Sequence, residues 1–88
     1  MVFRLLGADI RTEVKTADGR IDAVVENADT VYILEFKLNG TAQEALDQIN
    51  KKEYFLSFRN SGKKVIAIGI EFSRQTRNIA EWIIQKIE

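Results

Sequence analysis

The 88-residue sequence contains neither cysteine nor histidine. Without cysteine the chain can form no disulfide and no thiolate zinc site, which agrees with a reducing cytoplasm. Without histidine it can supply no histidine base, no Ser-His-Asp triad and no imidazole ligand to a metal. Any metal ion bound by these residues must therefore be held by oxygen.

Long apolar runs are absent as well. The longest are of strand length, such as residues 31–34, whereas a helix that spans a bilayer needs roughly 20 apolar residues. The opening residues 1–7 are too short, and too soon interrupted by Arg4, for a signal peptide. We therefore expect a cytoplasmic protein that is neither inserted in a membrane nor exported.

No net charge attracts the chain to nucleic acid, because thirteen basic residues balance thirteen acidic ones. The distribution is uneven, since acidic residues dominate the first third and basic residues gather later. Four of the later ones are Lys51, Lys52, Lys63 and Lys64. We interpret them as a solvated face, with a phosphate-binding surface beside an acidic pocket as the alternative.

The composition itself is ordinary for a packed soluble domain, since 45% of the residues are hydrophobic and 30% are charged. The length predicts one domain, residues 1–88, near the small end of what folds alone. No repeat, linker or proline-rich segment divides it.

The first half of the chain predicts a helical remnant followed by three strands. Residues 2–6 resemble the last turn of a helix ending at Gly7, so we expect a truncated or excised unit that lacks most of an upstream helix. Alternating polar and apolar residues then predict a strand up to a turn at residues 17–19. Two segments rich in Val, Ile and Tyr predict a β-hairpin, residues 20–27 and 30–38.

The second half predicts a helix and a buried strand. Thr41 and Glu44 have the spacing of a capping box, and apolar residues recur at helical spacing to about Phe58. The apolar run 65–70 predicts a central strand buried on both faces. Residues 79–88 fit a strand or a helix, and we favour the strand. The predicted fold class is α/β (α+β), in the order β-β-β-α-β with a last strand or helix.

Two charged residues in the second hairpin strand point to chemistry. Glu35 and Lys37 are two positions apart and so project from the same face. The opposite face carries the apolar side chains expected to form the core: Tyr32, Leu34, Phe36 and Leu38. Core packing therefore does not explain why Glu35 and Lys37 occupy this strand.

Asp22 lies opposite Glu35 if the hairpin turn has two residues, Ala28 and Asp29, or four. Two carboxylates so placed have β-carbons about 4.5–5.5 Å apart and destabilise a sheet unless positive charge lies between them. A hard divalent cation with oxygen ligands supplies that charge. Lys37 adds a fixed positive charge beside an attacked phosphate, so the three residues indicate a hydrolytic site. A turn with an odd number of residues would break it.

The site belongs to a longer series of short motifs. They are Gly-Arg-Ile-Asp at residues 19–22, Glu-Phe-Lys at 35–37 after twelve intervening residues, Ala-Leu-Asp-Gln-Ile at 45–49, Tyr54, Gly-Lys-Lys-Val at 62–65 and Gly-Ile-Glu-Phe-Ser at 69–73. Together they resemble the PD-(D/E)XK nuclease superfamily over nearly the whole chain. More narrowly, they are similar to the nuclease-like domain at the C-terminus of certain bacterial AAA-ATPase-like proteins.

This resemblance implies a restriction-endonuclease-like core with a mixed central sheet, and metal-dependent hydrolysis of phosphodiester bonds in DNA. It implies Mg²⁺ or Mn²⁺ held by Asp22 and Glu35, with the carbonyl of Phe36 as a candidate further ligand. Lys37 would orient or activate water. Gln48 would contact the site or the nucleic-acid backbone.

The sequence departs from the family pattern in three places. Ile21 replaces the proline that names the motif, a change that many members tolerate. The upstream helix, which often carries an additional active-site glutamate, is reduced to residues 2–6. The spacing from Gln48 to Tyr54 exceeds the Gln-x-x-x-Tyr of related exonucleases. Glu13 is either an exposed strand residue or a further acid that approaches the pair from the neighbouring strand.

Two functions are therefore weighed. The first is a DNA nuclease, favoured by the retention of Asp22, Glu35 and Lys37 together. The second is a catalytically inactive module that binds nucleic acid or a partner AAA-type ATPase, favoured by the missing helix. An uncovered apolar strip on the sheet would also favour a homodimer.

Overall fold

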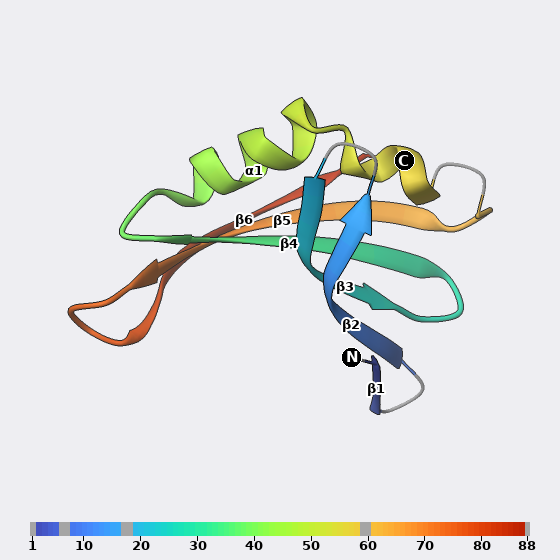
Figure 1. The fold of residues 1–88 in the computed structure, drawn as a ribbon, viewed down its shortest axis with the longest axis horizontal. Coiled ribbons are helices and arrows are strands. Elements are labelled where there is room, and N and C mark those ends of the chain that lie inside the picture. The colour runs from blue at the N-terminus through green and yellow to red at the C-terminus, as the bar shows by residue number, and fades with distance from the viewer. Residues whose placement is uncertain (1, 6–7, 17–18, 59–60, 88) are drawn as a thin grey trace.

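The computed structural model describes residues 2–5, 8–16, 19–58 and 61–87. Its elements are β1 (Val2–Leu5), β2 (Ala8–Thr16), β3 (Gly19–Glu26), β4 (Thr30–Leu38), α1 (Ala42–Lys51), the 3₁₀ helix η1 (Tyr54–Phe58), β5 (Lys64–Ser73) and β6 (Asn78–Lys86). The strands form one mixed sheet in the order β1-β2-β3-β4-β5-β6, and α1 lies along one of its faces (Figure 1). Neighbouring strands are antiparallel except β4 and β5, which are parallel. Within these ranges no helix has the length and apolar character that crossing a membrane requires.

The helix α1 provides the crossover that the parallel β4–β5 pair requires. It begins at the predicted capping box: the Glu44 N–H donates to the Thr41 hydroxyl at 3.0 Å, and the Thr41 N–H donates to the Glu44 carboxylate at 2.9 Å. The predicted continuation to Phe58 is wrong, because α1 ends before Glu53, whose φ of 52° no α-helix accommodates. The apolar spacing continues because η1 follows and buries Tyr54.

The core lies between the two helical segments and the sheet face beneath them. Its buried side chains include Ile21, Val24, Val31, Ile33, Leu46, Ile49, Tyr54, Val65 and Ala67. Gly69 in β5 allows the helix to approach closely. A Cβ at this position would overlap the carbonyl oxygen of Ala42 and lie 2.7 Å from the backbone nitrogen of Leu46. The helix backbone therefore rests almost directly on the sheet.

The core face predicted for β4 is wrong. The helix covers the face that carries Val31, Ile33 and Glu35, all of which are buried. Phe36 and Leu38, expected in the core, are 44% and 49% exposed on the opposite face. Both faces of β4 carry apolar side chains, so alternation alone could not choose between them. The side on which the crossover helix packs makes the choice.

The predicted strand at residues 65–70 is confirmed as part of β5, which lies between β4 and β6. Burial on both faces is confirmed only in part. Val65 and Ala67 are buried beneath the helix, whereas on the other face Ile70 is buried and Ile66 and Ile68 are only half-buried. The favoured strand at the end of the chain is also confirmed, because β6 pairs antiparallel with β5.

The predicted helical remnant at the start of the chain is wrong, because Val2–Leu5 form the edge strand β1, paired antiparallel with β2. A single helical turn makes few backbone hydrogen bonds, whereas a strand at the edge of the sheet can form backbone hydrogen bonds with β2 along its length. The predicted helix end at Gly7 and the first two turn residues at 17–18 lie outside the described residues. The strand predicted from Ile10 is confirmed as β2.

Candidate active site

The turn between β3 and β4 determines which residues face one another. Ala23 lies opposite Leu34, and the Asn27 N–H donates to the Thr30 carbonyl at 3.0 Å, which closes a turn at residues 28–29. This is the even-numbered turn that the two-acid hypothesis required. Asn27 also holds the turn through its side chain, whose Oδ1 accepts hydrogen bonds from the N–H groups of Asp29 and Thr30 at 2.9 and 2.8 Å.

The next position in this register brings Asp22 beside Glu35. Here a side chain replaces the backbone acceptor of the β3–β4 ladder: the Phe36 N–H donates to the Asp22 carboxylate at 2.9 Å. The Asp22 side chain is thereby held against β4. Two carboxylates from adjacent strands thus share one corner of the sheet.

Glu35 is a carboxylic acid buried beneath α1, where only 3% of its surface is exposed. Its Oε1 accepts a hydrogen bond from Gln48 Nε2 at 3.2 Å. Its Oε2 is buried and has no hydrogen-bond partner among the described atoms. Burial, and then the neighbouring Asp22, raise the pKa of Glu35 from its usual 4.5 to about 8, with a partial offset from Lys37.

Gln48 reaches Glu35 because it lies on the sheet-facing edge of α1. Ala45 and Ile49 are buried in the core on the neighbouring face of α1. Gln48 lies at the border of that face and is half-buried. The structure therefore brings together the two acids and the helix glutamine that the sequence singled out.

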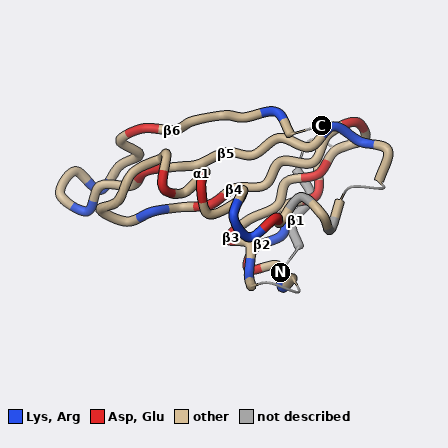
Figure 2. The backbone as a smooth tube through the Cα atoms, turned by 90° about the horizontal axis from the view of Figure 1, so that it is seen from above, with Lys and Arg blue, Asp and Glu red and all other residues tan. Residues whose placement is uncertain are grey.

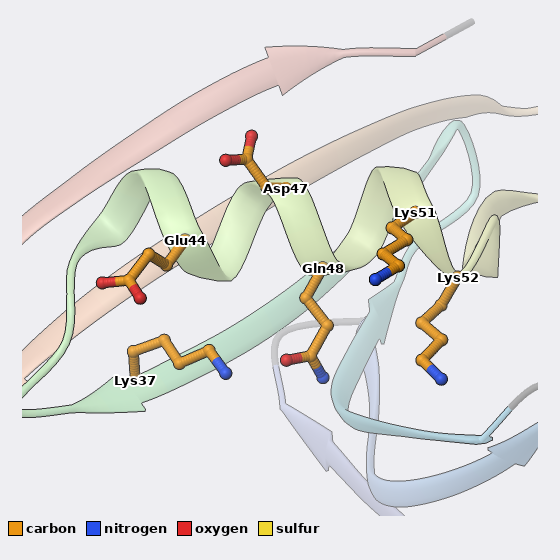
Figure 3. A pocket seen from close by; sticks show the side chains of 6 residues that line it. All are labelled: Lys37, Glu44, Asp47, Gln48, Lys51 and Lys52. Atoms are coloured by element: carbon orange, nitrogen blue, oxygen red, sulfur yellow. The ribbon is translucent and has the colours of Figure 1, made fainter.

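Lys37 lies two residues beyond Glu35 on the same strand face and is half-buried. It lines an open hollow of about 350 Å³, which we call the α1 hollow, together with Glu44, Asp47, Gln48, Lys51 and Lys52. Figure 3 shows the Lys37 side chain extending toward the amide of Gln48. From the sequence, a phosphate-binding surface beside an acidic pocket was only the alternative interpretation of Lys51 and Lys52, and their closeness to Gln48 was not used. The signal was available, because they follow Gln48 at positions i+3 and i+4 of a helix.

Two other residues considered from the sequence contact Arg20, and one of them, Glu13, stands in β2 between the residues that pair with Ala23 and Ile21 of β3. Glu13 is a strand residue with a positive φ of 53°, and its side chain is 71% exposed and 3.9 Å from the Arg20 guanidinium. Tyr54 is buried, and its hydroxyl donates to the Arg20 carbonyl at 3.1 Å, so its place is structural. Across the described ranges, no group of three or more His, Cys, Asp and Glu side chains is arranged to hold a metal.

The sheet face away from α1, which we call the open sheet face, is largely apolar. It carries a hollow of about 380 Å³ lined by Leu34, Ile68, Ile70, Ile79, Trp82 and Ile84. Trp82 and Ile84 on the edge strand β6 are 61% and 60% exposed. Figure 2 shows how few charges β6 carries, namely Glu81 and Lys86.

The domain is α+β with a restriction-endonuclease-like core. It has a mixed sheet with a helical crossover, two acids on adjacent strands, and a lysine two residues after the second acid. Comparison with known families agrees: the chain belongs to the PD-(D/E)XK nuclease superfamily, whose model matches residues 1–82. It is 36% identical over 87 residues to an uncharacterized protein encoded in the vnfD 5′ region of Azotobacter chroococcum mcd 1. The match covers 97% of this chain and 17% of that relative, so the domain is there part of a larger protein. No solved structure matches the chain.

Proposed function

We propose that this domain is a metal-dependent nuclease that hydrolyses phosphodiester bonds in DNA. The observation that carries the proposal is the environment of Glu35. A buried carboxylic acid beside a second acid, with one oxygen that accepts no hydrogen bond from the described residues, costs stability unless it serves a bound ligand. Nothing in the packing of the core requires an acid at this position.

The residues present suit Mg²⁺ or Mn²⁺. Both ions prefer oxygen ligands, and Mg²⁺ is commonly held by one or two carboxylates together with substrate phosphates and water. Asp22 and Glu35 would supply the carboxylates. The Phe36 carbonyl is a third donor, because it points to the same side of the strand as its N–H, toward Asp22. A bound cation would neutralise both acids, polarise the phosphate and lower the pKa of a water molecule.

The neighbouring side chains have separate tasks. Gln48 donates to Oε1 of Glu35 and so holds the carboxylate in one orientation, which leaves Oε2 to contact a cation. Lys37 extends its amine over the same face, where it would orient the attacking water and stabilise the charge that builds on the phosphate. Neither task requires histidine.

Thermal unfolding with and without Mn²⁺ tests whether the acids hold a cation. At a hundred times the dissociation constant, Mn²⁺ should stabilise the parent by about 2.7 kcal/mol, a rise in Tm of roughly 10–20 °C for a domain of this size. Glu35→Ala should show no such rise. Glu81→Ala removes an exposed carboxylate from β6 and should respond like the parent. Equal responses of the Glu35 and Glu81 variants would remove the basis for a metal site.

A second function is favoured by one observation, namely that the domain accounts for only 17% of a longer relative. In it, the domain is an inactive module that binds nucleic acid or a partner AAA-type ATPase within a larger protein. Nicking of supercoiled plasmid with Mn²⁺ separates the two. A nuclease cuts, and Lys37→Ala loses cutting while keeping its thermal response to Mn²⁺. A module responds to Mn²⁺ or to DNA and leaves the plasmid intact.

The open sheet face supports a homodimer. Identical faces meet without repulsion when they carry little charge, and this face combines exposed apolar side chains with the edge strand β6. We expect sedimentation to reveal a dimer that Trp82→Lys together with Ile84→Lys converts to a folded monomer, since both side chains are exposed. A parent that sediments as a monomer across the micromolar range would contradict this.

A further inference from the structure

We infer that Lys51 and Lys52 form a phosphate-binding track that carries a nucleic-acid strand along α1 into the active site. The inference rests on the proposed nuclease function and identifies the surface that holds its substrate. Four observations support it: the position of the lysines, their freedom from ion pairs, the engagement of the nearby acids, and the contrast with the other basic residues.

The two lysines continue the row of the helix that contains Gln48. Residues three and four positions apart are neighbours on a helix surface, so Lys51 and Lys52 follow Gln48 one turn on. Four residues advance about 6 Å along a helix axis, so the two lysines stand about one turn past the helix position that contacts Glu35. In Figure 3 the side chains of Gln48, Lys51 and Lys52 all extend to the side of α1 on which Lys37 lies.

The amines of this row are available. Lys37, Lys51 and Lys52 line the α1 hollow, and none of them takes part in an ion pair among the described residues. Lys51 and Lys52 are exposed, so a ligand would not have to displace a buried contact to reach them. Three unpaired amines around one hollow favour a ligand with several negative charges.

The acids of the same hollow are already engaged. The Glu44 carboxylate accepts the Thr41 N–H in the capping box, and Asp47 accepts a hydrogen bond from Gln43 at 2.8 Å. Asp47 also points to the other side of α1 from the lysines (Figure 3). The acidic groups therefore stabilise the helix, and the amines face the solvent.

The other lysines of the sequence cluster are arranged differently. The Lys63 amine donates to Glu26, which also pairs with Arg11, at 2.7 Å and to the Asn27 carbonyl at 2.9 Å, so it is already engaged within the fold. Lys64 begins β5 and does not line the α1 hollow. The phosphate-binding interpretation therefore suits Lys51 and Lys52 but not Lys63 and Lys64.

A nucleic-acid strand is the polyanion that suits this arrangement. Its phosphates repeat along a line, as the amines do, and one of them must reach the acid pair for hydrolysis. Nucleic-acid binding of this kind is sequence-independent and falls steeply as salt rises, because each neutralised phosphate releases counterions.

Fluorescence anisotropy of a labelled DNA duplex, titrated in EDTA at several salt concentrations, tests the track without any cutting. Lys51→Gln with Lys52→Gln should weaken binding roughly tenfold or more at 0.1 M salt and lower the slope of log K against log salt by about 2. Lys15→Gln with Lys64→Gln removes the same charge from exposed positions on β2 and β5 and should change neither quantity. RNA of the same sequence, titrated in parallel, shows which backbone the track prefers.

The competing explanation is that these lysines only stabilise the negative end of α1. In that case the Lys51 and Lys52 variant would melt lower but bind like the Lys15 and Lys64 control, and the track would be overturned. The outcomes are also separable from those of the proposed function. A lysine-dependent salt slope in a protein that never nicks plasmid would keep the track and remove the nuclease. Nicking that is unaffected by loss of both lysines would keep the nuclease and remove the track.

Discussion

Glu35→Gln should make the metal-free protein more stable than the parent at pH 9 and leave its stability nearly unchanged at pH 5. Gln keeps the shape of the side chain and can still accept the hydrogen bond from Gln48. It removes the buried charge that the parent must carry once Glu35 ionises. The expected difference at pH 9 is on the order of 3 kcal/mol, a large share of the stability of a small domain.

The direction follows from the raised pKa of Glu35. The folded state holds the proton up to about pH 8, whereas the unfolded chain releases it near 4.5. The stabilising contribution of the protonated acid is complete below pH 4.5 and is lost as the pH rises to about 8. The slope is at most about 1.4 kcal/mol per pH unit, and no further loss is expected above that window.

Urea unfolding in EDTA at pH values from 5 to 9 measures this effect. The difference between parent and variant isolates Glu35, because all other titrating groups are shared. Glu81→Gln makes the same chemical change at an exposed position of β6 and should follow the parent at every pH. Parallel curves for the parent and Glu35→Gln would mean that Glu35 is not buried as described.

Gly69→Ala should destabilise the domain by about 3 kcal/mol, which lowers the Tm by roughly 10–20 °C. The added methyl group would meet backbone atoms of α1, the carbonyl oxygen of Ala42 and the amide nitrogen of Leu46. Backbone atoms cannot rotate away as a side chain would, so the helix must move. Because α1 carries Gln48, the same substitution should also weaken the response to Mn²⁺.

Gly62→Ala is the matched control for Gly69→Ala. Gly62 has a φ of +77° and open space around its Cα, so alanine there meets backbone strain but no clash. We expect a cost of about 1 kcal/mol and an unchanged response to Mn²⁺. If thermal melts rank the two variants in the opposite order, α1 does not rest on β5 at Gly69.

Local signals were sufficient wherever neighbouring residues decide the structure. The turn residues and the β-branched segments predicted the β3–β4 hairpin and limited its register to a choice between an even and an odd turn, because a short turn leaves few ways for two strands to pair. Thr41 and Glu44 predicted the start of α1 for the same reason, since a capping box is formed within one helical turn.

Local sequence patterns gave wrong predictions where the structure of a segment depends on contacts with an element distant in sequence. Residues 2–5 were expected to be helical because the sequence alone does not reveal that β2 offers them an edge. The end of α1 was misplaced because an apolar spacing continues through η1 without showing the change of backbone direction at Glu53. The core face of β4 was misassigned because both of its faces are apolar.

The sequence by itself determined which ligands these residues can offer: without histidine or cysteine, a metal would have to be held by oxygen, and the spacing of Asp22, Glu35 and Lys37 resembles the motif of the PD-(D/E)XK superfamily. Only the tertiary structure decided that Glu35 is buried beneath α1, that Gln48 reaches it, and that Lys51 and Lys52 are exposed while Lys63 is paired with Glu26. The reason is physical. Residue spacing along a strand or helix establishes which side chains share a face, but burial and ion pairing depend on which other element packs against that face.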